Sequence, residues 1–176
     1  MKISHLFFLL FLLLPQKSTA QTPVVERSAE ALIKGTQEGS EITGDVTLRE
    51  EAGGLVVKVS LYNVPNPGKH GFHIHDKGSC DEGGTAAGGH FNPKDAPHGF
   101  IIKNGLEHAH AGDMGNILIN EDGTGNFAIF LAGIDLGQGE MGVDGRAIIL
   151  HEKEDDFGQP TGNAGGRIGC GIIKVH

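Results

Sequence analysis

Histidine is the residue through which this sequence is best equipped to do chemistry, because neutral imidazole is the commonest metal ligand in proteins. The chain has ten histidines in 176 residues, and eight of them lie between His70 and His151. His73 and His75 are two positions apart in a segment that alternates like a strand, so their side chains leave the same face and can converge on one ion. A pair at this spacing is also compatible with a solvated polar face.

A second set of candidate ligands lies in one stretch rich in Gly and Pro: His90, His98, His110 and Asp113. Three imidazoles and one carboxylate match the tetrahedral nitrogen and oxygen set of a closed zinc site. A metal would also explain how so long an irregular stretch is held in place. His108 lies two residues before His110, and spacing alone leaves both as candidates.

His151 is the last candidate ligand, at the end of the apolar run 147–150. From another strand of the same sheet it could reach the pair formed by His73 and His75. Taken alone, a histidine in such a place is more often a surface residue or one with its hydrogen bonds satisfied.

Period-two alternation of apolar and polar residues predicts a framework of strands. Segments 41–48 and 55–61 alternate clearly on either side of the turn 52–54, which predicts a hairpin. Further short strands are predicted at 71–75, 116–120, 126–131, 147–151 and 171–175. Long irregular stretches are expected at 76–115, 132–143 and 152–168. No segment after residue 20 shows sustained helical periodicity, so we expect an antiparallel sandwich or flattened barrel.

Length and composition support one all-β domain. The 29 glycines favour turns and loops and disfavour a helical bundle. The formal net charge of −8 and the absence of a Lys/Arg run argue against nucleic acid as a partner, because phosphates require a basic face.

The N-terminus has the pattern of a secretory signal peptide over residues 1–20. Lys2 precedes the apolar stretch 6–14, and the small residues 18–20 precede a cut near Ala20/Gln21. The apolar stretch is far shorter than the ~20 residues that span a bilayer, so no stable membrane insertion is expected. Cleavage removes two lysines and no acid, which changes the formal charge from −8 to −10. The mature domain would then be 21–176, secreted or periplasmic.

Cys80 and Cys170 are the two cysteines of the chain. An exported protein meets an oxidising compartment, so a disulfide between them is expected. A zinc site of the cysteine type is the alternative, but neither residue has a CxxC partner.

Five segments, taken in order, resemble the signature segments of copper/zinc superoxide dismutases. They are GFHIH at 71–75, HFNP at 90–93, HAGDMGN at 110–116, HEKEDD at 151–156 and GNAGGRIGCG at 162–171. The resemblance extends over about residues 31–175. The implied fold is an eight-stranded antiparallel Greek-key β-barrel. This family is commonly grouped with the β-sandwich proteins.

The resemblance also implies one copper and one zinc per subunit. Copper would be held by His73, His75, His90 and His151. Zinc would be held by His90, His98, His110 and Asp113. His90 would therefore bridge the two metals, and it is His110, not His108, that stands three residues before the aspartate as in the family motif.

Other matched positions have implied roles around these metals. Asp155 matches the aspartate that links a copper histidine to a zinc histidine, here His73 to His98, and fixes their rings. Arg167 matches the arginine beside the copper channel, and His70 a buried structural histidine that binds no metal. The pair Cys80–Cys170 matches the disulfide within each subunit.

The implied activity is dismutation of superoxide to O₂ and H₂O₂, with Arg167 and His90 as catalytic residues and no cofactor beyond the metals. The alternatives are a non-enzymatic exported protein that binds copper and zinc, and a structural β-sandwich with incidental histidines. A storage site has no use for an anion-docking cation, so Arg167 favours the enzyme.

Two further expectations concern partners. Cys80 follows His75 by five residues, which resembles bacterial periplasmic members of the family. Members of the family assemble differently, and here we expect a homodimer, with the monomer as the alternative. The acidic chain should repel the superoxide anion at long range. Lys77, Lys94 and Lys103 are therefore candidates for local steering.

Overall fold

The computed structural model describes residues 27–176, and this part of the chain is built almost entirely of strands. They are β1 (Ser28–Gly35), β2 (Thr43–Glu51), β3 (Gly54–Tyr62), β4 (Gly68–His75), β5 (Asp113–Ile119), β6 (Gly125–Ala132), β7 (Ala147–His151), β8 (Arg167–Ile172) and β9 (Lys174–Val175). The helices of residues 27–176 are the short 3-10 helix η1 (Glu82–Ala87) and α1 (Ile101–Asn104). Within the same residues no helix is long and apolar enough to cross a membrane.

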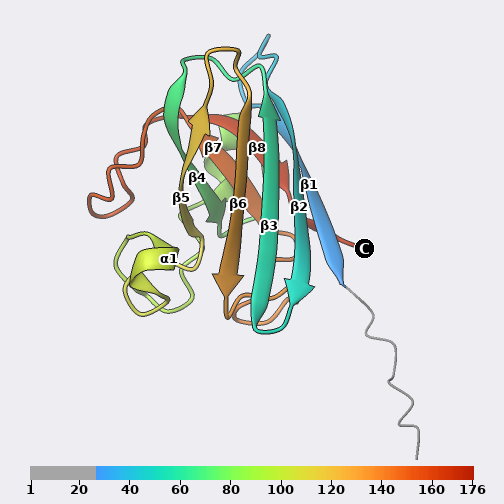
Figure 1. The fold of residues 1–176 in the computed structure, drawn as a ribbon, viewed down its shortest axis with the longest axis vertical. Coiled ribbons are helices and arrows are strands. Elements are labelled where there is room, and N and C mark those ends of the chain that lie inside the picture. Colours follow the sequence, from blue (N-terminus) through green and yellow to red (C-terminus); the bar gives the residue numbers. More distant parts are fainter. Residues whose placement is uncertain (1–26) are drawn as a thin grey trace, which may run out of the picture.

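Eight strands close into an antiparallel barrel (Figure 1). Around the barrel the order is β1-β2-β3-β6-β5-β4-β7-β8, and β8 pairs with β1 again. The short strand β9 also pairs with β1. The connections from β3 to β4 and from β6 to β7 pass over intervening strands, which is the Greek-key pattern. The predicted eight-stranded antiparallel Greek-key barrel is confirmed.

The alternating strands bury one face each. In β2, Val46 and Leu48 point inward and are 1% exposed, whereas their neighbours face solvent. They lie opposite Val59 and Val57 of β3, so the predicted hairpin is confirmed with slightly longer strands. Burial of an aliphatic side chain of this kind stabilises the fold by about 1.5–3 kcal/mol.

Strand β4 differs because both of its faces are buried. Phe72 and Ile74 point into the core, and His73 and His75 point outward, yet none of the four is exposed. The strand is covered on its outer face by long connections. Backbone bonds join these connections to β4, such as Ile74 N–H to the oxygen of Gly112 at 3.0 Å.

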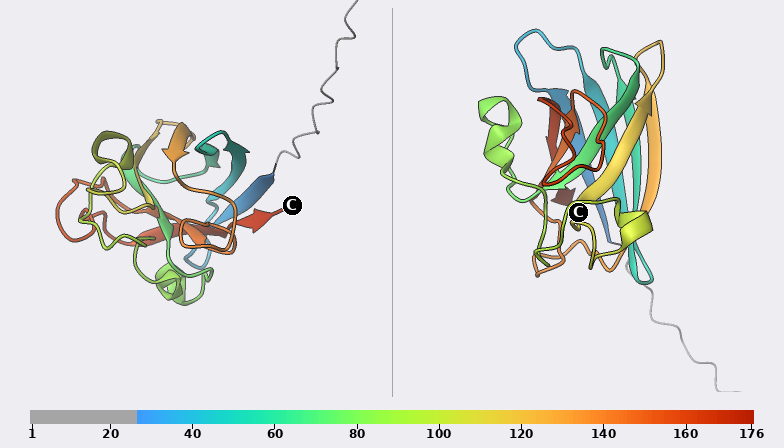
Figure 2. Two further views of the ribbon diagram at one scale, coloured as in Figure 1. Left: turned by 90° about the horizontal axis from the view of Figure 1, so that it is seen from below. Right: turned by 90° about the vertical axis from the view of Figure 1, so that its left-hand side faces the viewer.

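Two of the long connections have segments on the same side of the barrel. Figure 1 shows the loop 152–166, in red, and the segment around α1, in yellow-green, beside β4 and β5. This side faces the viewer in the right-hand panel of Figure 2. The predicted irregular stretches are confirmed in outline, although η1 and α1 form within the first of them.

One strand was not predicted from the sequence, and another was located only in part. Strand β1 was not anticipated, because two of its inward residues, Ala29 and Ala31, give little hydrophobic contrast. The single strand predicted at 171–175 is divided into β8 and β9, and β8 begins earlier, at Arg167. The missed part, 167–170, contains Gly169, and glycine has low strand propensity. Gly169 lets β8 approach β1 closely, because a Cβ there would lie 3.1 Å from Cγ2 of Ile33.

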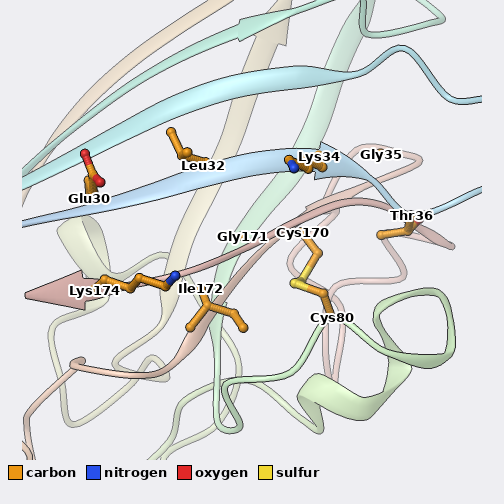
Figure 3. A pocket seen from close by; sticks show the side chains of 10 residues that line it. All are labelled: Glu30, Leu32, Lys34, Gly35, Thr36, Cys80, Cys170, Gly171, Ile172 and Lys174. Atoms are coloured by element: carbon orange, nitrogen blue, oxygen red, sulfur yellow. A yellow bond between two sulfur atoms is a disulfide. The ribbon is translucent and has the colours of Figure 1, made fainter.

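The predicted disulfide is present. Cys80, in the loop after β4, is joined to Cys170 in β8, with their Cα atoms 5.7 Å apart. Figure 3 shows the bond at the edge of an open pocket beneath β1. The bond attaches the loop to the barrel next to η1. The predicted signal peptide, residues 1–20, and its cleavage site lie outside the described residues.

Removing this bond should destabilise the fold. The cysteines are 90 positions apart, and closing so long a loop is worth roughly 4–5 kcal/mol in the chain-entropy model. Replacing Cys80 and Cys170 together by Ser should therefore lower Tm in calorimetry by about 10 °C. Reductant should lower the Tm of the natural chain similarly and leave the double variant unchanged. An identical Tm for the natural chain with and without reductant would contradict this.

Candidate metal centre

Four histidines gather on the outer face of β4 and β7. His73 and His75 leave the same face of β4, as predicted, and His151 ends the adjacent strand β7. His90 joins them from the covering loop through an isolated bridge to His75. All four are at most 8% exposed, and one ligand atom from each lies within 4.8 Å of the others. A buried group of imidazoles at this spacing suits a transition metal.

A second group lies directly beside the first. Asp113 opens β5 opposite His73, and its Oδ1 accepts hydrogen bonds from Nδ1 of His90 at 2.7 Å and Nδ1 of His110 at 3.1 Å. Nδ1 of His98 lies 2.9 Å from the other carboxylate oxygen. The four ligand atoms of His90, His98, His110 and Asp113 again lie within 4.8 Å of one another. Their types match a zinc site.

His90 belongs to both groups. Its ring centroid is 4.2 Å from that of His73 on one side and 5.4 Å from that of His110 on the other. Nδ1 of His90 faces Asp113. One imidazole can therefore offer a nitrogen to each of two ions.

The nitrogens that face away from the first group are held by hydrogen bonds. Nδ1 of His75 donates to the oxygen of Gly88 at 3.0 Å, and Nδ1 of His151 lies 3.5 Å from the oxygen of Gly165. As a result, Nε2 of His75 and Nε2 of His151 face each other at 3.4 Å. Such partners fix the tautomer and the direction of each ring, so the remaining nitrogens converge.

Asp155 connects the two groups. Its carboxylate accepts from Nε2 of His73 at 2.8 Å and from Nε2 of His98 at 2.9 Å, and all three side chains are fully buried. Asn116 holds the aspartate through both backbone groups, with bonds of 2.8 and 2.9 Å. Gly162 closes over this contact, because a Cβ there would collide with Oδ1 of Asp155.

The buried atoms left without a partner provide a test for metals. Among residues 27–176, the buried side-chain atoms without a hydrogen bond are Nδ1 of His73 and Nδ1 of His98. The short contact of the latter with Asp113 lacks hydrogen-bond geometry. Leaving a buried polar atom unpartnered is costly. One such atom points into each group, so the residues fit a metal in each.

The pKa values favour the forms that bind metals. Burial, aided by neighbouring imidazoles, lowers the pKa of His90 to about 4 and that of His151 to about 3, and lowers that of His75 as well. These rings are neutral at pH 7, as ligation requires. Burial would raise the pKa of Asp113, but its three histidine partners hold it far below the usual range.

His98 has the opposite shift. Burial would lower its pKa, but the carboxylates of Asp113 and Asp155 raise it to about 9. Burial likewise would raise the pKa of Asp155, but His73 and His98 hold it well below its usual range. A metal that binds His98 must therefore displace a proton.

Arg167 lies next to the first group. It pairs with His151 across β7 and β8, and its guanidinium donates to the oxygen of Gly84 at 2.7 Å and to that of Gly88 at 2.6 Å. Partial burial lowers its pKa. The carbonyl oxygen of Gly88 also accepts a hydrogen bond from Nδ1 of His75. Arg167 and a candidate ligand are therefore held by the same backbone carbonyl.

The other histidines of residues 27–176 belong to neither group. His70 is 2% exposed, and its two nitrogens face the oxygens of His151 and Asn66 at 2.8 and 2.7 Å, so neither is free for a metal. His108 is exposed, and it is His110 that meets Asp113.

Sequence reasoning did not identify the carbonyls of Gly88 and Gly165 or the role of Asn116. No local signal marks them, since they act only after distant segments meet.

The fold and site together define a class: an antiparallel β-barrel in which one buried histidine is common to two groups of candidate metal ligands. A family model described as copper/zinc superoxide dismutase (SODC) matches residues 42–173. A crystal structure of the clock protein EA4 is similar to this chain with a TM-score of 0.73 and 34% identity, over 89% of this chain and 99% of that one. The chain belongs to the copper/zinc superoxide dismutase family, as the resemblance implied.

The metal-free protein should lose stability as the pH falls from about 6.5 toward 4. His75, His90 and His151 resist protonation when folded but accept protons when unfolded, at an ordinary pKa of about 6.5. The unfolded state thus binds more protons, and the unfolding free energy falls by up to about 1.4 kcal/mol per pH unit for each ring. His98 acts in another window, since its stabilising contribution is full below about 6.5 and is lost as pH rises through about 9.

Urea unfolding of metal-free protein at several pH values measures this slope. The slope of unfolding free energy against pH gives the number of protons taken up on unfolding, and His151→Asn should reduce that number by about one. His108→Asn, at an exposed position, is the matched control and should not change the slope. A slope unaffected by His151→Asn would contradict the assignment.

Proposed function

We propose that this protein converts two superoxide anions and two protons into O₂ and H₂O₂. One copper per subunit would be held by His73, His75, His90 and His151. One zinc per subunit would be held by His90, His98, His110 and Asp113. The observation that supports this most strongly is the pair of buried groups that share His90, in a chain of this family.

When bound, copper would supply one-electron chemistry through Cu(II) and Cu(I), and zinc would hold the far nitrogen of His90. The chain's own residues orient these ligands. The pKa of Asp155 lies well below its ordinary value, so its side chain stays ionised. We propose that it acts as a fixed carboxylate for His73 and His98 and not as a proton donor. His90 is the proposed general acid: its nitrogen on the His73 side can hold a proton and give it to the reduced oxygen species.

Arg167 is the proposed docking group for the anion. Guanidinium keeps its charge at all relevant pH values and offers several donors in a plane. Two of its nitrogens are already fixed by carbonyls of the loop, so the cation is oriented before substrate arrives. A protein that only stores metal has no need of it, which favours the enzyme over the non-enzymatic alternative.

Local positive charge must offset the acidic chain. Three lysines were expected to steer superoxide. Nζ of Lys94 is paired with Oε1 of Glu140 at 3.3 Å, and Lys103 lies in α1. The exposed Lys77 packs its methylenes against Gly88, where a Cβ would lie 3.5 Å from them, on the backbone that also binds Arg167. We therefore favour Lys77 for steering, through attraction that falls with ionic strength.

We further propose export of the protein after cleavage near Ala20 and assembly into a homodimer. The disulfide supports an oxidising compartment. Sedimentation of the 21–176 protein at micromolar concentration tests assembly, and a single species of monomer mass would contradict the dimer.

Replacing His151 by Ala tests the function directly. Superoxide consumption by the metal-loaded variant should fall to the uncatalysed rate, because one of the four copper ligands is lost. Zinc content, measured by mass spectrometry, should stay at one per chain, since His151 is not in the second group. His108→Ala is the control and should keep full activity. Full activity of the His151 variant would contradict the ligand assignment.

Replacing Arg167 by Glu tests docking. The rate at low ionic strength should fall by two or more orders of magnitude, because an anion would meet a carboxylate in place of a cation. Lys58→Glu makes the same change of charge on the exposed face of β3 and should have a much smaller effect. Equal rates for the Arg167 variant and the natural chain would exclude Arg167 from the site.

A further inference from the structure

The backbone of His98 is held by a side chain from the loop 152–166. Its N–H donates to Oε1 of Gln159 at 3.1 Å, and its carbonyl oxygen accepts from Nε2 of Gln159 at 2.8 Å. One amide thus satisfies both backbone groups of a single residue. The two residues are 61 positions apart in the sequence, so this contact is tertiary.

The ring of His98 is held by the same loop. Nε2 donates to Asp155, and Phe157 stacks on the ring with centroids 6.4 Å apart and planes at 21°. Asp155 is itself held by the amide of Asn116 through both backbone groups. Each end of the hydrogen bond between Asp155 and His98 therefore has an amide that fixes its backbone.

His98 needs this support more than its neighbours do. Asp113 is part of β5, His90 is bridged to β4, and the N–H of His110 donates to Asp113 at 3.0 Å. His98 lies in the irregular segment between η1 and α1, with no strand of its own. Residues that hydrogen-bond a metal ligand, without binding the metal themselves, raise metal affinity. Their loss typically lowers that affinity 10–100-fold.

We propose that Gln159 is a positioning residue for the second metal group: it holds the backbone of His98 so that Nδ1 points at the metal, and thereby slows zinc release. This proposal rests on the proposed function, because it takes the group of His90, His98, His110 and Asp113 as the zinc site. Gln159 is exposed, so its replacement leaves the core intact.

The test uses the full mature chain loaded with copper and zinc. Zinc release into excess chelator is followed by the metal content of the recovered protein for the natural chain, Gln159→Ala and Gln159→Met. Methionine keeps the length of the side chain and removes both hydrogen bonds. Asn163→Ala is the matched control, because Asn163 is an amide of the same loop that bonds Asp156 and not His98.

Both Gln159 variants should release zinc about tenfold faster, whereas Asn163→Ala should match the natural chain. Cobalt(II) placed in the zinc group should show altered visible bands in the Gln159 variants only, which reports ligand geometry independently of activity. Natural release rates or natural cobalt bands in Gln159→Ala, equal acceleration in Asn163→Ala, or a natural rate in Gln159→Met would each overturn the proposal. Failure of the natural chain to bind zinc would overturn the proposed function instead.

Discussion

Imidazole nitrogens buried on the outer face of the barrel are the constraint on which the rest of the structure depends. A buried polar atom needs a partner. His73, His75 and His151 each turn one nitrogen to a protein acceptor and direct the other toward the neighbouring rings. His73 shows this most clearly, with Nε2 bonded to Asp155 and Nδ1 left unpartnered. Two metal ions would satisfy the converging nitrogens, and the proton-poor state of His90 and His151 leaves them ready for that role.

The barrel and the loops divide the work of building this site. Strands β4 and β7 set the spacing of His73, His75 and His151 through regular pairing. The loops supply His90, His98 and His110, whereas Asp113 opens β5. The loops also exclude water from the outer face of β4. The disulfide at Cys80 and the cation at Arg167 attach the loop after β4 to β8. The rigid part of the molecule therefore fixes half of the site, and crosslinks fix the other half.

How far the sequence predicted the molecule follows from the range of each signal. Alternation predicted the hairpin of β2 and β3 and the shared face of His73 and His75, because strand geometry is local. Strand β1 was missed, since Ala29 and Ala31 contrast too little with their neighbours. Spacing could not choose between His108 and His110; that choice came from the family resemblance.

Contacts between distant segments had no local signal. Gln159 and Asn116 are ordinary loop and strand amides until folding brings them to His98 and Asp155. Nothing in the residues around position 159 marks it as a support for position 98. The ligand roles themselves stay predictions, supported by how closely the seven implied positions gather into two groups that share His90.

The measurement that tests the account most directly is metal content and superoxide consumption on the same sample of the 21–176 protein, after loading with copper and zinc. The account predicts one copper, one zinc and rapid, cyanide-sensitive turnover. Both metals without turnover would contradict the enzymatic function and favour a metal-binding protein. Absence of bound metal would contradict the site itself.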